Sequence, residues 1–371
     1  MEPGTATQLS PRGRRAVALI AVSLLTIAVA GLAWVGPGLH LAIPANPIIT
    51  AGNPVPPAPL RPTVYSFVIW SAGWADVGGL GDESTVFKTE DGGRHWRRQI
   101  TLVGAWTGSI QFLDLTHGFV VTSNPGRLYR TIDGGAHWKP IAVSQGDTIE
   151  ITFADPQHGW LLVSQADRSQ LPAIFGTADG GDSWTPLSKA PKDSYGPILR
   201  GSEVWLSARG NEAGPLRVYV SVDGGVSWSS REVPRPPGSN PDASALSPFW
   251  AKVRALPGGG VAVLAHSGTE LAQFVSFDGS TWKYVARPPG EYLGIGYGNG
   301  SQWWSAGASG SLFESSDAGR TWVQTPSQLP PGLTTFYVLD SQDAWVQVVS
   351  TLLFTGDGGL HWSKVSTPSM S

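Results

Sequence analysis

The sequence predicts an all-β protein, a seven-bladed β-propeller with four-stranded antiparallel blades, preceded by one N-terminal transmembrane helix. A short motif recurs seven times, and its copies lie 42, 46, 44, 55, 39 and 40 residues apart. This period is typical of one four-stranded blade per repeat. The composition is rich in Gly (47), Pro (30) and Trp (17), which suits short strands joined by tight turns around large aromatic side chains.

The composition also excludes some classes of function. Charged residues make up 14% of the 371 residues and the net charge is −3, so there is no polybasic surface for nucleic acid. The chain contains no Cys, so it has neither disulfides nor thiolate metal sites. We expect no cofactor and no bound metal.

The N-terminal part predicts three segments that precede the propeller. Residues 1–15 are a short cytoplasmic N-terminus with three arginines, residues 16–36 are the transmembrane anchor, and residues 37–62 are a Pro-rich stalk. An apolar helix of this length spans about 31 Å, enough to cross a bilayer core. The arginines precede the apolar run, which places the propeller, residues 63–371, on the extracytoplasmic side of the cell membrane. The alternative is a signal segment that is cleaved near Ala28-Val29-Ala30, which would leave a secreted protein.

The repeated motif, which we call the box, reads Ser/Thr-x-Asp-x-Gly-x-x-Trp, with the fifth copy one residue short. The Asp carboxylate can accept hydrogen bonds from neighbouring backbone N–H groups, and the Ser or Thr hydroxyl can add another. Glycine allows the positive φ of a tight turn, and the Trp can anchor the returning strand between blades. We therefore predict a structural role for the box residues Asp91, Asp133, Asp179, Asp223, Asp278, Asp317, Asp357, Trp96, Trp138, Trp184, Trp228, Trp282, Trp322 and Trp362.

A weaker repeat precedes some boxes and is read as the innermost strand, a turn and the start of the second strand. Its copies are Phe112–Phe119, Phe153–Trp160 and Val338–Trp345. On this interpretation the blades begin near residues 65, 108, 149, 197, 250, 292 and 335. Seven complete units need no exchanged strand, so we expect the first blade to pack against the seventh.

These two repeats carry a family resemblance over about residues 63–368. The box matches the BNR or Asp-box repeat of sialidases, sortilin-like receptors and several glycosidases. Together with the Phe-x-Asp-x-x-His-Gly-Trp strand, it resembles the photosystem II stability/assembly factor family and its relatives in non-photosynthetic bacteria. In that family a basic surface patch is associated with binding a membrane-protein assembly partner. Here the clustered arginines of the propeller are Arg94, Arg97 and Arg98, in and just after the first box.

We expect a non-catalytic binding or assembly module for a protein or a glycan. The loops opposite the boxes vary in length and would form the binding face. Charged loop residues and exposed aromatics would make the recognition surface, and the candidates are Trp106, Arg168, Arg209, Glu212, Glu270, Trp303 and Trp304. A sensor that relays a signal across the membrane is a further possibility.

The alternative is a glycoside hydrolase, sialidase-like or another Asp-box glycosidase. A sialidase resemblance implies six blades and a Phe/Tyr-Arg-Ile-Pro motif, whereas Leu60-Arg61-Pro62 lacks the Ile. Another glycosidase would need two facing carboxylates, and the acids in predicted loops are Asp82, Glu83, Glu212 and Glu270. The histidines before box tryptophans share the turn interpretation, and a metal site at His117 and His158 would need two neighbouring turns to converge.

Overall fold

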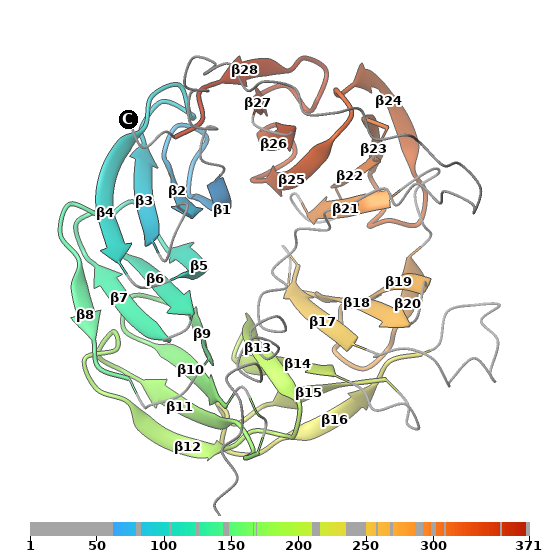
Figure 1. Ribbon diagram of the computed structural model, residues 1–371. Helices are drawn as coiled ribbons and strands as arrows, with labels where there is room; N and C mark the ends of the chain where they lie inside the picture. The colour runs from blue at the N-terminus through green and yellow to red at the C-terminus, as the bar shows by residue number, and fades with distance from the viewer. Residues whose placement is uncertain are drawn as a thin grey trace, which may run out of the picture.

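Short strands rich in buried residues pair in antiparallel sheets, which are arranged as a ring in the computed structural model (Figure 1). The structure describes residues 62–78, 83–103, 106–123, 126–143, 148–165, 167, 169–209, 216–234, 250–256, 259–267, 270–285, 292–297, 302–307, 309–348 and 351–368. The predicted cytoplasmic segment, the transmembrane segment and the stalk up to Arg61 lie outside these ranges. Within them, no helix combines the length and the apolarity that crossing a bilayer requires.

Five sheets in the described residues have four strands each, taken consecutively from the chain. Their strands are β1 (Pro62–Phe67), β2 (Gly73–Gly78), β3 (Glu83–Thr89) and β4 (Arg97–Val103); β5 (Trp106–Phe112), β6 (Gly118–Ser123), β7 (Arg127–Thr131) and β8 (Lys139–Ile141); β9 (Thr148–Phe153), β10 (Gly159–Ser164), β11 (Ala173–Thr177) and β12 (Thr185–Lys189); β21 (Tyr292–Tyr297), β22 (Trp303–Gly307), β23 (Ser311–Ser315) and β24 (Val323–Gln328); β25 (Leu333–Val338), β26 (Ala344–Val348), β27 (Thr351–Thr355) and β28 (Ser363–Val365).

A further sheet has eight strands. They are β13 (Ser194–Arg200), β14 (Glu203–Arg209), β15 (Arg217–Ser221), β16 (Ser229–Glu232), β17 (Trp250–Ala255), β18 (Val261–Ser267), β19 (Glu270–Ser276) and β20 (Lys283–Val285). Its two halves, β13–β16 and β17–β20, are joined where Ala208 and Arg209 pair with the start of β17. This is possible because β15 pairs with β14 only at Val204–Leu206, which leaves the end of β14 free for a second partner.

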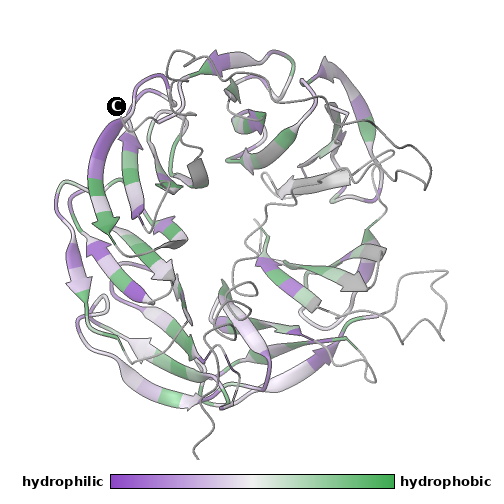
Figure 2. Ribbon diagram, viewed as in Figure 1, coloured by the Kyte–Doolittle hydropathy of each residue, from purple (hydrophilic) through white to green (hydrophobic). Residues whose placement is uncertain are grey.

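The first strand of each unit lies nearest the centre of the ring, and the fourth strand lies at the periphery (Figure 1). The inner strands begin at Pro62, Trp106, Thr148, Ser194, Trp250, Tyr292 and Leu333, close to the predicted starts. Figure 2 shows apolar and polar residues alternating along many strands, as expected where one face of a strand is buried. The architecture is therefore that of an all-β propeller built from antiparallel sheets.

The hydrophobic core lies between neighbouring sheets. One cluster joins Phe119 and Leu128 of β6 and β7 to Ile149 and Leu161 of β9 and β10. Another joins the first and last sheets, because Tyr65 and Phe67 of β1 pack with residues of β26, β27 and β28. No strand is exchanged between the described sheets, and the first and last sheets meet through side chains, as the sequence predicts.

The boxes form the turns between third and fourth strands. In the second box, Asp133 Oδ1 accepts a hydrogen bond from the hydroxyl of Thr131 at 2.8 Å and one from the N–H of His137 at 2.9 Å. Gly134 and Gly135 have φ of 71° and 93°, which only glycine adopts without strain. The other boxes repeat this pattern around Asp91, Asp179, Asp223, Asp278, Asp317 and Asp357.

Each box tryptophan is half-buried and packs against a cluster that lies between adjacent sheets. The seven residues are Trp96, Trp138, Trp184, Trp228, Trp282, Trp322 and Trp362. Several meet an aromatic ring of an inner or second strand edge-on; Trp138, for example, meets Phe112 at an interplanar angle of 89°. The box thus links a local turn to the packing of neighbouring sheets.

The weaker repeat forms the turn between the first and second strands. Asp114 Oδ1 accepts hydrogen bonds from the N–H groups of Thr116 and His117, both at 2.7 Å. The ring of Phe112 lies over Gly118, where an added Cβ would come within 2.3 Å of it. The glycine of this motif is therefore needed because the aromatic ring occupies the space of a side chain.

Candidate functional site

The predicted binding residues lie in different parts of the chain, and the structure describes only some of their side chains. Arg168 and Glu212 lie outside the described residues, as do the side chains of Trp106 and Glu270, whose backbones begin β5 and β19. Arg209 lies exposed at the end of β14. Of these five predicted residues, Arg209 is therefore the one whose side chain the structure describes, and the search for a site starts from it.

The prediction that Trp303 and Trp304 supply exposed aromatic surface is wrong. Their exposed fractions are 0% and 1%, and both side chains belong to clusters between sheets. In register, Trp304 pairs with Glu314 next to the box serine, just as the buried Trp345 pairs with Phe354 next to the box threonine. Alignment on the box would have identified Trp304 as a core position.

Arg209 belongs to a group of charged and polar side chains that also includes residues of the inner strands β9, β13 and β17. We call this group the inner-strand cluster; it comprises Glu150 of β9, Tyr195 of β13, Arg209 of β14, and Lys252 and Arg254 of β17. Arg209, at the C-terminal end of β14, pairs with the first residue of β17. The cluster therefore extends from the ends of the sheets opposite the box turns, where the loop face was predicted.

Glu150 is the carboxylate of this cluster. It lies on β9 between Ile149 and Ile151, which pack into the core, so its side chain points to the opposite face of the strand. Its Oε2 atom accepts a hydrogen bond of 2.7 Å from the N–H of Gly196 in β13. Burial raises the pKa of Glu150, while this hydrogen bond and the charges of Lys252 and Arg209 oppose the rise.

Lys252 is half-buried, and its surroundings disfavour the charged form of its amine. Its neighbours Ala251 and Val253 are buried in the core, so Lys252 and Arg254 share the other face of β17. Burial, and secondarily repulsion from Arg254, lowers the pKa of Lys252 to about 8, against the attraction of Glu150. No ion pair or hydrogen bond joins Lys252 to another described side chain.

Tyr195 supports the cluster from β13. Its hydroxyl donates to the carbonyl of Ala251 at 3.4 Å, a long contact that links β13 to β17. The guanidinium carbon of Arg209 lies 5.5 Å from the centre of the Tyr195 ring, within the range of a cation–π contact. Burial raises the pKa of Tyr195, so its hydroxyl stays neutral and can act as a hydrogen-bond partner.

The arrangement favours the binding of an anion. The inner-strand cluster contains three cationic side chains, Arg209, Lys252 and Arg254, and one carboxylate, Glu150. A cation that is partly removed from water and lacks a direct partner is stabilised by an incoming negative group. Carboxylates and phosphates are the groups that arginine and lysine recognise best.

Sequence reasoning missed this cluster because its members come from separate repeats. A local signal was nevertheless present, since Glu150, Lys252 and Arg254 interrupt inner strands whose alternate positions are apolar. Charged residues on a strand face that is not part of the core mark a surface with another role. Of the clustered arginines noted in the sequence, Arg94 lies exposed in the first box, and Arg97 and Arg98 begin the outer strand β4 and are exposed.

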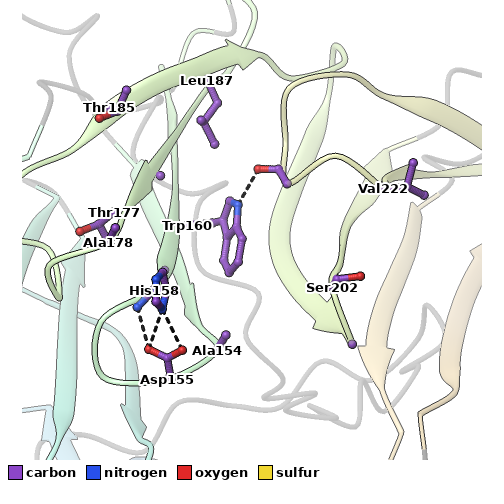
Figure 3. A pocket seen from close by; sticks show the side chains of 14 residues that line it. Ala154, Asp155, His158, Trp160, Thr177, Ala178, Thr185, Leu187, Ser202 and Val222 are labelled. Atoms are coloured by element: carbon purple, nitrogen blue, oxygen red, sulfur yellow. Dashed lines mark hydrogen bonds and ion pairs between the residues drawn. The ribbon is translucent and has the colours of Figure 1, made fainter.

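A shallow cleft of about 640 Å³ lies on the opposite, box-bearing side, between β9–β12 and the β13–β16 half of the eight-stranded sheet (Figure 3). Trp160 lies in it and donates from Nε1 to the carbonyl of Gly224 at 2.8 Å. Asp155 is its acidic group, and the N–H groups of Gln157 and His158 already satisfy one oxygen of that carboxylate. The cleft therefore presents turn residues whose polar groups are paired with one another.

The histidines of the two motifs lie where the motifs predict, and each pairs with the carboxylate that forms its own turn; they are His95, His117, His137, His158 and His361. His158 Nδ1, for example, lies 2.9 Å from Asp155 Oδ2, and His117 Nδ1 lies 2.8 Å from Asp114 Oδ2. In the part of the chain that the structure describes, no three His, Asp or Glu side chains are grouped so as to hold a metal ion. These pairs explain the histidines as turn residues.

Comparison with known proteins identifies similar chains. No protein-family model matches the sequence. The photosystem II assembly lipoprotein Ycf48 of Synechococcus sp. (strain CC9902) is 30% identical over 286 residues, which cover 64% of this chain and 80% of that protein. Among solved structures, YCF48 bound to a D1 peptide is similar with a TM-score of 0.57 at 18% identity, over 84% of this chain and 95% of that one.

Enzymes are also among the structural neighbours. A puromycin hydrolase has a TM-score of 0.59 at 10% identity, over 84% of this chain and 54% of that one. At such identities, likeness to a solved structure shows a shared fold and leaves activity to be argued from the site.

Proposed function

The chain belongs to the Ycf48 family of photosystem II assembly proteins, and on that premise we propose that it is a non-catalytic assembly factor that binds a segment of another protein. The observation that supports this proposal is the inner-strand cluster, which combines an excess of positive charge with a half-buried lysine that forms no ion pair with the side chains that the structure describes. We assign the binding site to this cluster. A relative whose structure was solved with a bound D1 peptide supports a peptide as the kind of ligand.

Electrostatics favours this site over the cleft on the box side. Desolvated charges gain more from a complementary partner than solvated ones do, and Lys252 is such a charge. In the cleft, by contrast, the charged group Asp155 is held within its own turn. An acidic or carboxylate-bearing protein segment is therefore the ligand class that we expect.

We further propose that the ring has seven blades. The eight-stranded sheet then counts as two blades, β13–β16 and β17–β20, since each half repeats the order of the four-stranded sheets. Each half also carries a box between its third and fourth strands, at Asp223 and at Asp278. The short pairing between β14 and β17 joins the two blades without replacing a strand of either.

We also propose that residues 16–36 anchor the propeller to the cell membrane and that the propeller lies on the extracytoplasmic side. The similar Synechococcus protein is named a lipoprotein, whereas this chain contains no cysteine to carry an S-linked lipid. An apolar helix preceded by three arginines would supply the membrane attachment instead. Secretion after cleavage of this segment is the alternative.

The hydrolase alternative requires two carboxylates that face each other across a site. Of the acids considered for this role, Asp82 and Glu212 lie outside the described residues, together with the side chain of Glu270, and Glu83 begins β3 as an exposed residue. In the inner-strand cluster, Glu150 faces cations. The inner-strand cluster therefore supports the binding of a ligand over hydrolysis.

A peptide-binding assay tests the proposed function. The full-length chain would be titrated with labelled eight-residue peptides of Gly, Ala and Leu that carry either two Glu or two Gln. We expect the wild-type protein to bind the acidic peptide more tightly, and the double variant Arg209→Met, Lys252→Met to lose this preference. Equal binding of the two peptides by the wild-type protein would overturn the proposal.

A further inference from the structure

The cleft on the box side lies where one turn of the chain is shorter than its counterparts. In the sheets β1–β4, β5–β8, β9–β12 and β25–β28, five residues link the first strand to the second (68–72, 113–117, 154–158 and 339–343). In the half-sheet β13–β16, Gly201 and Ser202 alone link β13 to β14. Both residues line the cleft, together with Asp155 and His158 of the turn between β9 and β10 (Figure 3).

The five-residue turns cover the box of their own sheet. A carbonyl of each turn accepts a hydrogen bond from the N–H of the box glycine that follows the Asp; these bonds join Gly92 to Ser71 at 2.9 Å, Gly134 to Thr116 at 2.8 Å, Gly180 to Gln157 at 2.8 Å and Gly358 to Gln342 at 3.1 Å. The cover is close, because a Cβ added to Gly134 would lie 2.6 Å from the carbonyl oxygen of Leu115. In these four sheets the chain therefore supplies its own acceptor for the glycine.

Gly224 has the same position in the fourth box but lacks this cover. Its φ of 72° matches the 71° of Gly134, so the box turns have the same conformation there. A Cβ added to Gly224 would meet nothing within 4 Å, and its N–H forms no hydrogen bond with any residue that the structure describes. A half-buried N–H group of this kind is stabilised when an acceptor reaches it.

Trp160 is also less covered than its counterparts. Its indole N–H donates to the carbonyl of Gly224, just as that of Trp74 donates to the carbonyl of Gly134. Trp74 is fully buried, whereas Trp160 is only half-buried. Val222, which precedes the box Asp, lines the same cleft and is 69% exposed. The cleft therefore combines an apolar surface with a main-chain donor, which is typical of ligand sites.

We propose that the cleft binds a tight turn of a partner protein, which takes the place that a five-residue turn of this chain occupies in four other sheets. A main-chain carbonyl of the partner accepts the N–H of Gly224, and an apolar side chain next to it covers Trp160 and Val222. An uncharged turn suits the cleft, because the Asp155 carboxylate already pairs with His158 at 2.9 Å. This second contact lies on the side opposite to the inner-strand cluster and does not depend on the function assigned to that cluster.

Hydrogen exchange of the free full-length chain tests the main-chain donor. We expect the amide of Gly224 to exchange with solvent at least about tenfold faster than the amides of Gly134 and Gly180, because those two are hydrogen-bonded and covered. Equal protection of the three amides would overturn the proposal. Slower exchange of Gly224 at higher concentrations of the chain alone would assign the cleft to a second copy of this chain, which would also contradict it.

Binding would be measured by fluorescence anisotropy with a ring-closed peptide that has the sequence of Phe153–Trp160, the turn that the chain itself uses in β9–β12. A linear peptide with the same residues in scrambled order has the same charge and no fixed turn. We expect the ring-closed peptide to bind the wild-type chain more tightly than the scrambled one and to slow the exchange of the Gly224 amide. Equal binding of the two peptides would contradict a site for a turn.

Val222→Glu tests the apolar part of the cleft. Ile132→Glu is the matched control, because Ile132 has the same position in the second box, is 64% exposed and precedes a box whose glycine is covered. We expect Val222→Glu to bind the ring-closed peptide about tenfold less tightly, since a charge next to an apolar ligand must be partly desolvated. Ile132→Glu should bind it as the wild type does, and equal affinities of the two variants would overturn the proposal.

A turn graft fills the same space with the chain's own sequence. Gly201-Ser202 would be replaced by Ala-Asp-Pro-Gln-His, the turn that links β9 to β10. We expect the grafted turn to accept the N–H of Gly224, to slow the exchange of that amide and to abolish binding of the ring-closed peptide. Undiminished binding by the grafted chain would show that the peptide does not occupy this space.

The double variant Arg209→Met, Lys252→Met separates this inference from the proposed function. It should lose the preference for acidic peptides but bind the ring-closed peptide as the wild type does. If the wild-type chain shows no preference for acidic peptides, the proposed function fails and the cleft remains a site for a turn. Loss of ring-closed peptide binding in the double variant would place that peptide at the inner-strand cluster and contradict the inference.

Discussion

The ring of Phe67 in β1 stacks on the ring of Trp345 in β26, with centroids 3.8 Å apart and planes inclined by 12°. These residues belong to the first and last sheets, so their contact closes the circle. The indole N–H of Trp345 also donates to the carbonyl of Gly92 in the first box at 3.2 Å. Closure therefore depends on side chains, since no strand passes between the two sheets.

Replacement of Phe67 by Ala should open this junction. We expect the free energy of unfolding to fall by about 3–5 kcal/mol, because a buried aromatic ring is lost and a cavity is left. Denaturant unfolding would measure it. The control is Trp70→Ala, at a ring that is 49% exposed, where we expect a change within about 0.5 kcal/mol. Equal effects of the two substitutions would contradict closure by the Phe67–Trp345 stack.

Gly118→Ala should destabilise the protein although alanine is small. Its Cβ would lie 2.3 Å from the Phe112 ring, which stacks on Trp74 and cannot move freely. We expect a loss of about 1–3 kcal/mol, as found for overpacked sites. Gly78→Ala is the matched control, since nothing lies within 4 Å of the added Cβ there. If both variants unfold at the same denaturant concentration, the proposed role of Gly118 is wrong.

The boxes should make stability depend on acid pH. Hydrogen bonds from the N–H and the ring of His137 lower the pKa of Asp133 to about 2, whereas an unfolded Asp has a pKa of about 3.9. The folded state thus favours the carboxylate, and its contribution is present above pH 4 and is lost as the pH falls towards 2. The pKa values of Asp317 and Asp357 are likewise lowered to about 2.

Asp133→Asn should therefore lower Tm at pH 7 and make the decline of Tm between pH 5 and pH 2 less steep. Thermal unfolding followed by circular dichroism would measure both. Glu232→Gln, whose carboxyl is exposed on an outer strand, should change neither. A wild-type slope in Asp133→Asn would show that the Asp133 carboxylate does not stabilise its turn.

Lys252 should reduce stability while it serves binding. Burial lowers its pKa to about 8, against about 10.4 in the unfolded chain. The charged amine is thus disfavoured in the folded state below pH 8, and the penalty disappears as the pH rises above 10. Lys252→Met should raise the free energy of unfolding at pH 7 by about 2–3 kcal/mol, with less gain at pH 10.

The same variant should bind acidic peptides less tightly, which a purely structural lysine would not explain. Lys139→Met is the control, because Lys139 is exposed and pairs with Asp182 at 2.8 Å. Its free energy of unfolding should change by no more than about 0.5 kcal/mol, and peptide binding should not change. Unaltered peptide binding in Lys252→Met would remove Lys252 from the site.

The sequence allowed prediction of those features that depend on residues close together in the chain. The box turn is one, because Thr131, Asp133, Gly135 and His137 make its hydrogen bonds within seven positions. The inner strands were also located, because apolar residues and turn residues alternate with a fixed period. The expectation of exposed tryptophans at Trp303 and Trp304 failed because exposure depends on which neighbouring sheet covers a strand.

The site itself could not be predicted in this way. Glu150, Arg209 and Lys252 belong to three different repeats, and only the curvature of the ring brings them together. A single charged residue in a strand gives no indication of the charges that it will face. The structure supplied the pairing of β14 with β17, in which Arg209 pairs with Trp250, two residues before Lys252.

The most direct test of the account is to map where an acidic peptide binds. Amide chemical shifts of the isotope-labelled full-length chain would be followed during titration with the peptide that carries two Glu. We predict the largest changes at Gly196, Arg209, Ala251 and Lys252. Changes confined to the box-side cleft, at Thr177, Ala178, Ser202 and Val222, would contradict the assignment of the binding site to the inner-strand cluster.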